Sequence, residues 1–290
     1  MATKKAYVNK LLITGIVLIS VFIKWMFFPS FREPLISFGN QYNIHSELSD
    51  IRIAIYRGRG MDRHSALALC RAFQWMGCRV EPIRAANIRD GDLHRIDVLA
   101  LPGGANRPDP WKKIGSEGKE RIQEFIRNGG GYIGICLGAL YACENCLYWG
   151  DTLGVKELYL ELFPGMAYCG QEKIAPEGVW PLMTGINVSD QMHSITGSLD
   201  SRVEIVYYPG SPYFKPDSGA DITIIAQYRI TQNPAMVAFK YGKGNVFLSG
   251  PHPEIEVDSR RDGSNRFNEL ADEGSEWSLL LAVIQWMTSD

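Results

Sequence analysis

The sequence has no excess of charge of either sign. Its 290 residues include 30 Lys and Arg against 32 Asp and Glu, which gives a formal net charge of −2. No basic stripe with interleaved aromatic residues is present, so we expect no nucleic-acid partner. Internal repeats and low-complexity tracts are also absent, which excludes a repeat architecture and a largely disordered chain. The hydrophobic share of 46% is typical of a packed globule, and the length allows one α/β domain of roughly 240 residues with an N-terminal extension.

Cysteines are few, and their spacing gives little support to a metal site. Of the six cysteines, Cys143 and Cys146 form a C-x-x-C pair. A structural zinc site would need a second ligand pair at suitable spacing, which the sequence lacks. We therefore predict no metal and no cofactor. The pair follows the central motif described below by about two helical turns, so we expect both cysteines on one helix face. A metal or disulfide role is the minor alternative.

The longest apolar run lies near the N-terminus, at Leu11–Ile23. Three lysines precede it, and Trp25–Phe28 extend it beyond Lys24 as an interfacial belt. We predict a single-pass signal anchor over residues 1–28, a membrane helix with the domain on the non-cytoplasmic side, in a periplasm or lumen. A cleaved signal peptide with a secreted domain is the alternative, and a cytosol-facing domain also stays open. Residues 29–50 contain Pro and show no periodicity, so we predict a linker there.

The central motif is Gly131–Ala139, a buried strand that breaks into a helix with a cysteine at the corner. Gly134 and Gly138 flank Cys136 as in the nucleophile elbow G-x-C-x-G, where the sharp turn leaves room only for small residues at these positions. The turn places the sulfur at the N-terminus of the next helix, where the N–H of Leu137 and the helix dipole favour a thiolate. A buried structural cysteine in a Gly-rich strand end is the alternative interpretation.

A second motif, Pro-His-Pro-Glu, follows a late apolar strand at Asn245–Ser249. Pro253 keeps His252 out of the helical region, and in an extended chain residues two apart point the same way. The Glu254 carboxylate is therefore expected beside the His252 ring, where it would fix the tautomer. His252 would then be the base for Cys136, in the nucleophile–base–orienter order of a triad. A loop histidine with a solvated neighbour is the alternative.

Two further features are candidates for a substrate site. Gly103 and Gly104 follow the apolar strand Val98–Leu101, and glycines at a strand's carboxyl end let backbone N–H groups bind an oxyanion. The stretch 207–214 combines aromatic residues with Pro and Gly, which suits either a plain loop or an apolar pocket wall with hydroxyl groups. The tyrosines that we assign to that wall are Tyr207, Tyr208 and Tyr213.

Strands and helices alternate along the first half of the domain. Predicted strands cover 51–56, 79–83, 98–101 and 131–135, with a helix after the first strand, another over 117–127 and a third after the central motif. After about residue 150, short β-rich runs dominate until a last amphipathic helix. We predict an α/β fold with a mostly parallel, doubly wound, flavodoxin-like sheet and a β-rich C-terminal half, preceded by the N-terminal hydrophobic helix. All three motifs would lie at the carboxyl ends of the strands, where ligands bind in such folds.

The three motifs occur together in one known superfamily. Leu101–Ala105, Gly134–Ala139 and Ser249–Glu254 stand in the order in which class I glutamine amidotransferase-like proteins carry a Gly-Gly turn, a G-x-C-x-G elbow and a late His-Pro-Glu. Within it, the sequence most resembles the N-terminal domain of eukaryotic biotin–protein ligases and its stand-alone relatives, over most of the chain. The resemblance implies an amidotransferase-like fold for residues 51–290 and supports the triad described above.

The sequence also departs from these families. Ala139 and Leu140 follow the elbow where glutamine amidotransferases usually have His-Gln to hold glutamine, so glutamine is in doubt as the substrate. The catalytic domain of the ligases is missing, and we predict neither biotin nor ATP binding.

Three functional hypotheses follow. The first is a cysteine-dependent amide or acyl hydrolase, or an amidotransferase-like enzyme, that acts on a small-molecule or peptide amide and holds the oxyanion with the N–H groups of Gly104 and Leu137. The second is a non-catalytic ligand-binding or regulatory module on the same scaffold. The third and weaker one is a redox sensor, in which a reactive Cys136 lies near Cys143.

Overall fold

The computed structural model describes residues 45–104, 109–152, 156–176, 181–189, 193–197, 200–256, 261–263 and 276–289. The N-terminal hydrophobic helix and anchor that we predicted over residues 1–28 lie outside the described residues, as does most of the linker. Among the described residues, no helix has the length and apolar character that a membrane span needs. The predicted localisation, a membrane anchor with the domain on the non-cytoplasmic side, is corrected on this finding.

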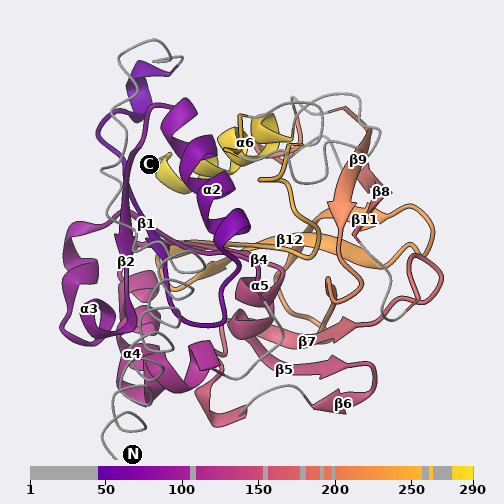
Figure 1. The fold of residues 1–290 in the computed structure, drawn as a ribbon, viewed down its shortest axis with the longest axis horizontal. Helices are drawn as coiled ribbons and strands as arrows, with labels where there is room; N and C mark the ends of the chain where they lie inside the picture. Colours follow the sequence, from indigo (N-terminus) through magenta and orange to yellow (C-terminus); the bar gives the residue numbers. More distant parts are fainter. Residues whose placement is uncertain are drawn as a thin grey trace, which may run out of the picture. The chain divides into compact units, whose positions relative to one another are not determined.

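A mixed sheet of nine strands, counted over the described residues, runs through the domain (Figure 1). Five neighbouring strands are parallel to one another. Their spatial order is β2 (Arg79–Ile83), β1 (Arg52–Tyr56), β3 (Val98–Leu101), β4 (Gly131–Ile135) and β13 (Gly244–Ser249). This order is that of flavodoxin-like folds, as predicted, with a strand from late in the sequence in the fifth place.

The other four strands extend the same sheet and are antiparallel. They follow β13 in the order β12 (Pro234–Tyr241), β11 (Thr223–Tyr228), β8 (Leu182–Val188) and β9 (Arg202–Tyr207). The sheet is therefore mixed, whereas we predicted a mostly parallel one. Short connections explain the difference, because a two-residue link such as Gly242–Lys243 between β12 and β13 can join only antiparallel strands.

Helices cover both faces of the parallel half, which makes the fold doubly wound. α2 and α6 pack on one face, and α3, α4 and α5 pack on the other (Figure 1). Strand side chains alternate between the two faces: along β1, Ile53 and Ile55 join the first cluster, and Ala54 and Tyr56 join the second. The helical elements are η1 (Ser46–Leu48), α2 (Arg63–Trp75), α3 (Ala85–Arg89), η2 (Asp92–Arg95), α4 (Asp109–Arg127), α5 (Leu137–Ala142), η3 (Lys156–Leu158) and α6 (Trp277–Thr288).

A second sheet of four strands corrects the placement of the C-x-x-C pair. Its order among the described residues is β10 (Tyr213–Pro216), β7 (Phe163–Cys169), β5 (Cys143–Tyr148) and β6 (Asp151–Thr152). We predicted Cys143 and Cys146 on a helix, but α5 ends at Ala142 and the chain turns into an extended conformation at Cys143. The predicted helix is wrong because β5 pairs with β7, which satisfies the backbone groups of this segment between strands. All six cysteines lie among the described residues as free thiols.

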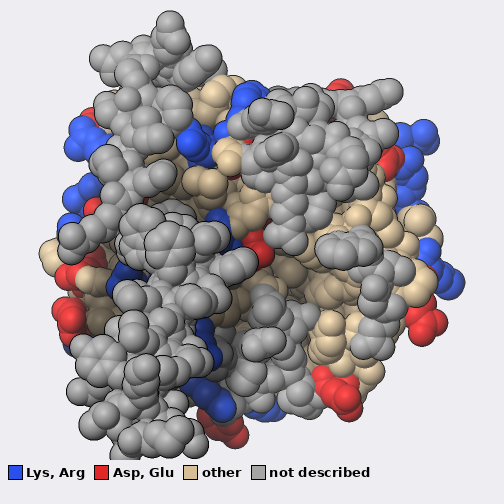
Figure 2. Space-filling model, viewed as in Figure 1, with Lys and Arg blue, Asp and Glu red and all other residues tan. Residues whose placement is uncertain are grey.

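Charge is mixed on the face of the domain drawn in Figure 2. Basic and acidic side chains of the described residues lie close together around its margin, with uncharged surface between them. Among the described residues, some opposite charges form ion pairs, such as Arg95 with Glu81 at 3.0 Å and Lys119 with Glu161 at 2.9 Å. Neither sign therefore dominates this face.

Candidate active site

Cys136 occupies a strained backbone turn between β4 and α5. Its φ of 49° and ψ of −105° are unusual for a residue with a side chain, and its N–H donates to the carbonyl of Ser249 at 2.8 Å. A Cβ at Gly138 would lie 2.1 Å from the carbonyl oxygen of Leu101, and a Cβ at Gly134 would lie 2.7 Å from that of Gly138. The packing around the elbow thus requires the two glycines that the motif places there.

The three sequence motifs meet because β3, β4 and β13 are neighbours in the sheet. The strands are parallel, so their carboxyl ends lie at one edge. Gly103 follows β3, Cys136 follows β4, and His252 follows β13. A Cβ at Gly103 would lie 2.5 Å from Cε1 of His252, so the imidazole packs directly on the Gly-Gly turn.

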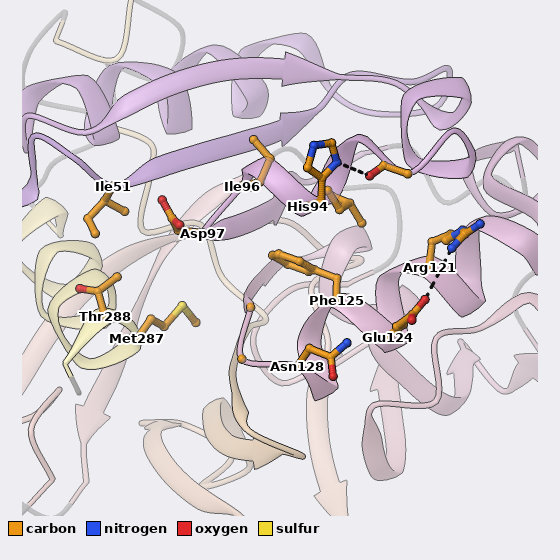
Figure 3. Close-up of a pocket in the computed structure, with 14 residues that line it drawn as sticks. Ile51, His94, Ile96, Asp97, Arg121, Glu124, Phe125, Asn128, Met287 and Thr288 are labelled. Atoms are coloured by element: carbon orange, nitrogen blue, oxygen red, sulfur yellow. Dashed lines mark hydrogen bonds and ion pairs between the residues drawn. The ribbon is translucent and has the colours of Figure 1, made fainter.

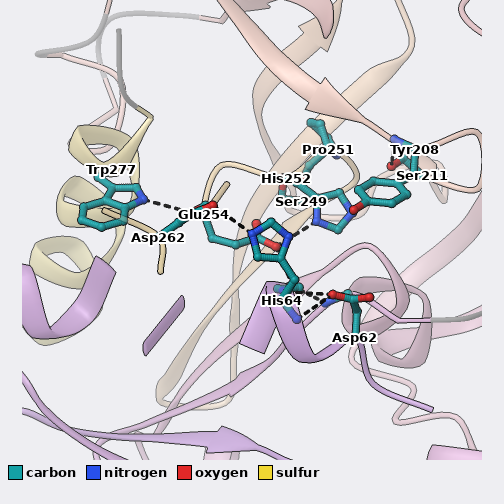
Figure 4. A network of polar contacts seen from close by, with 12 residues as sticks. Asp62, His64, Tyr208, Ser211, Ser249, Pro251, His252, Glu254, Asp262 and Trp277 are labelled. Carbon is teal, nitrogen blue, oxygen red and sulfur yellow. Dashed lines mark hydrogen bonds and ion pairs between the residues drawn. The ribbon is translucent and has the colours of Figure 1, made fainter. Parts of the chain in front are cut away.

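His252 and Glu254 form a buried pair (Figure 4). The Nδ1 atom of His252 lies 2.8 Å from Oε1 of Glu254, and the two residues are 3% and 0% exposed. The backbone N–H of His252 donates to the carbonyl of Val206 at 2.9 Å, while the indole N–H of Trp277 donates to the backbone carbonyl of Glu254 at 3.0 Å. These contacts fix the pair, and the carboxylate holds a proton on Nδ1 so that Nε2 is the ring atom free for proton transfer.

Cys136 lies close enough to His252 to act on the imidazole. Burial lowers the pKa of His252, but the Glu254 carboxylate and the Cys136 side chain raise it more strongly, to about 10. Nε2 has no hydrogen-bond partner among the described residues. The thiol is thus close enough to influence the imidazole without completing a hydrogen bond. Catalytic hydrogen bonds are often long or poorly aligned before substrate binds.

Ser65, which the sequence analysis did not identify, joins the Glu254 carboxylate to the Gly-Gly turn. Its hydroxyl donates to Oε1 of Glu254 at 2.6 Å and accepts from the N–H of Gly103 at 2.9 Å. Ser65 lies in the first turn of α2, where the Asp62 side chain caps the helix and accepts from the Ser65 N–H at 3.0 Å. Asp62 marks the helix start in the sequence, but no local pattern links Ser65 to a carboxylate 189 residues away.

The Gly103 N–H is engaged by Ser65, so Gly104 and Leu137 remain as the backbone donors for an oxyanion. The two residues pack together, since a Cβ at Gly104 would lie 2.7 Å from Cδ2 of Leu137. Leu137 is the first residue of α5, and N–H groups in a first helical turn have no partner within the helix. Gly103 has no side chain, and this absence lets the imidazole of His252 pack against its backbone.

The three predicted tyrosines take different positions around the triad. The ring of Tyr208 packs on the imidazole, with centroids 4.6 Å apart. Tyr207 is fully buried in the same hydrophobic cluster as Cys136. Tyr213 lies on β10 in the second sheet, stacks on Tyr168 with centroids 5.1 Å apart, and packs at the margin of that cluster. Tyr208 therefore contacts His252 directly, Tyr207 shares a hydrophobic cluster with Cys136, and Tyr213 lies at the margin of that cluster.

A family model described as the N-terminal domain of biotin–protein ligase matches residues 51–277. The chain belongs to the biotin–protein ligase N-terminal family. It is 23% identical over 239 residues to a biotin–protein ligase of Schizosaccharomyces pombe, which covers 76% of this chain and 37% of the ligase. It is 27% identical over 230 residues to an uncharacterised protein of Chlamydia muridarum, which covers 70% of this chain and 80% of that protein. The chain thus spans little more than a third of the ligase.

Solved structures show that this member of the biotin–protein ligase N-terminal family has a glutamine amidotransferase-like fold. A glutamine amidotransferase from Thermotoga maritima matches with a TM-score of 0.54 and 12% identity, over 83% of this chain and 99% of the other. A ThuA-like protein from Bacteroides uniformis matches with a TM-score of 0.52 and 13% identity, over 87% and 96%. These identities establish the fold alone, and they confirm the resemblance drawn from the motifs.

A cavity of about 660 Å³ lies at the other edge of the sheet in this family member (Figure 3). Its lining includes Ile51, Asp97 and Gly130, which directly precede β1, β3 and β4. Arg121 and Glu124 on its wall pair with each other at 3.6 Å. The cavity is therefore separate from the triad at the carboxyl edge, and we assign it no part in the chemistry.

Proposed function

We propose that the chain is a cysteine-dependent amide or acyl hydrolase, or an amidotransferase-like enzyme, that uses Cys136, His252 and Glu254 on a small-molecule or peptide substrate. One observation carries the proposal. A buried imidazole is held by a carboxylate at 2.8 Å, and a cysteine in a strained elbow lies close enough to raise the pKa of that imidazole. Strained backbone and titratable groups with shifted pKa values are typical of active sites.

The geometry supports a two-stage acyl transfer. Nε2 of His252, whose pKa is raised to about 10, holds the thiol proton of Cys136 before the reaction begins. The sulfur then attacks the acyl carbon, a C–S bond forms, and the electron pair of the C=O bond moves to the oxygen. The N–H groups of Gly104 and Leu137 hold this oxyanion. On collapse the C–N bond breaks, His252 protonates the departing amine, and a thioester remains on Cys136. Water or a second amine, deprotonated by His252, then attacks the thioester and restores the thiol.

Glu254 serves the same reaction without taking the proton. Its carboxylate holds the imidazole in the productive tautomer and stabilises the imidazolium that forms in each stage. The hydroxyl of Ser65 and the indole of Trp277 hold Glu254 in turn, through Oε1 and the backbone carbonyl respectively.

A non-catalytic ligand-binding or regulatory module is the second candidate. Cys136 is only 4% exposed, and Ala139 and Leu140 are fully buried apolar residues where glutamine amidotransferases carry polar ones. A binding module predicts ligand-dependent thermal stabilisation that persists in Cys136→Ala. The enzyme predicts instead that every detected turnover depends on the thiol.

Activity-based profiling of the full chain with acyl and amide electrophile libraries tests the proposal. We expect labelling of Cys136 that Cys136→Ala abolishes and that His252→Gln slows about 100-fold at neutral pH, since a general base contributes on the order of 10²–10⁴. His94→Gln, at the cavity on the other edge, is the matched control and should label normally. Equal reactivity of Cys136 and Cys70, together with indifference to His252→Gln, would contradict the proposal.

A further inference from the structure

Two side chains hold Glu254, and each comes from the first turn of a helix. The hydroxyl of Ser65 in α2 donates to Oε1 of Glu254 at 2.6 Å, and the indole N–H of Trp277 in α6 donates to the backbone carbonyl of Glu254 at 3.0 Å (Figure 4). Ser65, Trp277 and Glu254 are 1%, 1% and 0% exposed. The position of the Glu254 carboxylate beside His252 therefore depends on where these two helix ends lie.

A histidine–carboxylate contact fixes the end of α2. Nε2 of His64 lies 2.9 Å from Oδ2 of Asp262, and the two side chains are 8% and 0% exposed (Figure 4). His64 immediately precedes Ser65, and the Asp62 carboxylate accepts from the backbone N–H groups of both, at 2.8 and 3.0 Å. The two residues thus share one capped helical turn. A contact that holds His64 therefore also limits the movement of Ser65.

The residue next to Asp262 contacts the other support of Glu254. The guanidinium of Arg261 lies over the ring of Trp277, 4.6 Å from its centroid, which is within the range of a cation–π interaction. Its Nε and Nη2 atoms donate to Oε2 of Glu256 at 3.1 and 2.7 Å, and Glu256 is 1% exposed. A buried carboxylate is costly unless it is paired, so this pair keeps Arg261 in place over the indole.

We infer that Arg261 and Asp262 are positioning residues for Glu254, which they support from two sides. They are adjacent in the sequence, yet one contacts the α6 residue that holds the Glu254 backbone, and the other contacts the α2 turn that holds its side chain. A displaced carboxylate would turn the imidazole of His252 away from its productive orientation. The inference rests on the proposed function, because this orientation matters for the chemistry only if His252 serves Cys136.

Two measurements on the full chain report on this support. NMR follows the proton on Nδ1 of His252, which lies in the hydrogen bond to Glu254 and is identified by its loss in His252→Gln. Alkylation by iodoacetamide reports on Cys136, whose sulfur forms a bond to the methylene carbon as the C–I bond breaks and iodide leaves. Mass spectrometry gives its rate. The NMR signal responds to the geometry of the pair, and the alkylation rate responds to the effect of that geometry on the thiol.

Substitutions that remove either contact should change both measurements. His64→Leu and Arg261→Leu should each move the Nδ1 proton resonance of His252 and lower the alkylation rate of Cys136 about three- to tenfold. His64→Gln keeps an N–H donor near the place of Nε2, and Arg261→Lys keeps the positive charge beside the buried carboxylate. Both conservative variants should therefore recover most of the rate.

A control and a double variant make the test specific. Arg95→Leu is the matched control for Arg261→Leu, because it removes a half-exposed arginine that pairs with Glu81 at 3.0 Å. It should change neither measurement. Combining His64→Leu with Ser65→Ala tests whether His64 acts through Ser65. The double variant should be alkylated no more than about twofold more slowly than Ser65→Ala, because the hydrogen bond that His64 supports is already lost.

The possible results separate positioning from simple structural support. An unchanged Nδ1 resonance in both leucine variants would overturn the inference even where urea titration shows a loss of stability. Full multiplication of the two rate effects in the double variant would overturn it as well. If His64→Leu does not fold, Asp262→Asn, which keeps the shape of the side chain, takes its place with the same expected shift.

His252→Gln reports on the proposed function alone. If it leaves the alkylation rate of Cys136 unchanged, the triad fails. The Nδ1 resonance in the variants of His64 and Arg261 still decides whether these contacts position Glu254.

Discussion

Two sets of buried thiols in this domain differ in what the fold has placed around them. Cys143 and Cys146 lie in the ordinary extended backbone of β5, where their thiols donate to the carbonyl of Ala139 at 3.3 Å and to the hydroxyl of Tyr159 at 3.1 Å. Burial raises the pKa of Cys143 well above its usual value. Cys136 is 4% exposed, yet its backbone is strained and it lies close enough to the His252–Glu254 pair to act on the imidazole. Burial by itself makes a thiol inert, and an oriented base beside it is what distinguishes a candidate nucleophile.

The largest expected effect is the difference in reactivity between these two sets. Iodoacetamide at neutral pH should modify Cys136 at least about 1000-fold faster than Cys143, because only a thiolate reacts and burial raises the pKa of the Cys143 thiol. Cys146 should also react slowly, because it is 1% exposed and out of reach of the reagent. Quantitative mass spectrometry of the modified peptides over time measures both rates in the same sample. Comparable rates at the three positions would remove the distinction between the two sets.

The hydroxyl of Ser65 links Glu254 to the Gly-Gly turn, and its removal should bring the alkylation rate of Cys136 closer to that of the other buried thiols. Ser65→Ala takes a donor from Glu254 and an acceptor from the Gly103 N–H, so we expect about tenfold slower alkylation of Cys136 and a loss of roughly 1–3 kcal/mol in the free energy of unfolding. Ser65→Thr keeps the hydroxyl and should recover most of the rate. A positioning role also predicts that the pH profile of Cys136 alkylation shifts in Ser65→Ala. A loss of stability with an unchanged pH profile would reduce Ser65 to a structural residue.

The ionisable pair should also appear in the pH dependence of stability. Folding raises the pKa of His252 from its ordinary 6.5 to about 10, so the protonated form stabilises the fold. This contribution is fully present below pH 6.5 and is lost as the pH rises through about 10. The free energy of unfolding of the wild type minus that of His252→Gln should therefore fall over this range, by more than about 1 kcal/mol.

Urea titrations of the wild type and of His252→Gln at several pH values measure this difference. A difference that stays constant from pH 6.5 to 10 would mean that His252 is neutral in the folded chain. The thiol of Cys136 would then face an uncharged ring, and the contrast with Cys143 and Cys146 would rest on backbone strain alone.

Local patterns predicted the features that depend on near neighbours in the sequence. The strand at Arg79–Ile83 and the pairing of His252 with Glu254 follow from alternation and from residues two apart in extended chain. The elbow glycines follow from steric crowding within a few residues. The start of α4 was predicted less well than its end. The helix begins at Asp109, ahead of the predicted 117, because two helical pieces join across Gly115, whose φ is 69°.

Contacts between distant segments escaped prediction. Ser65 reaches Glu254 across 189 residues, and Gln171 reaches Asn233 across 62. The helix expected at Cys143 failed for the same reason, since pairing with β7 decides the conformation of that segment. The sheet is mixed because the antiparallel strands of the C-terminal half pair alongside β13. Strand propensity alone does not predict which strand they will pair with.

The smallest expected effect is that of a substitution at the C-x-x-C pair. Cys146→Ala removes a thiol that is 1% exposed and donates to the hydroxyl of Tyr159, so it should lower stability modestly, by about 1 kcal/mol. The rate of Cys136 alkylation should stay within about twofold of the wild type, because the hydrogen bond that the substitution removes goes to Tyr159 and not to His252 or Glu254. Alkylation kinetics beside a urea titration of the same variant measure both quantities. A tenfold change in the Cys136 rate would show that the two sets of thiols are coupled, and that burial in β5 helps to set the reactivity of the elbow.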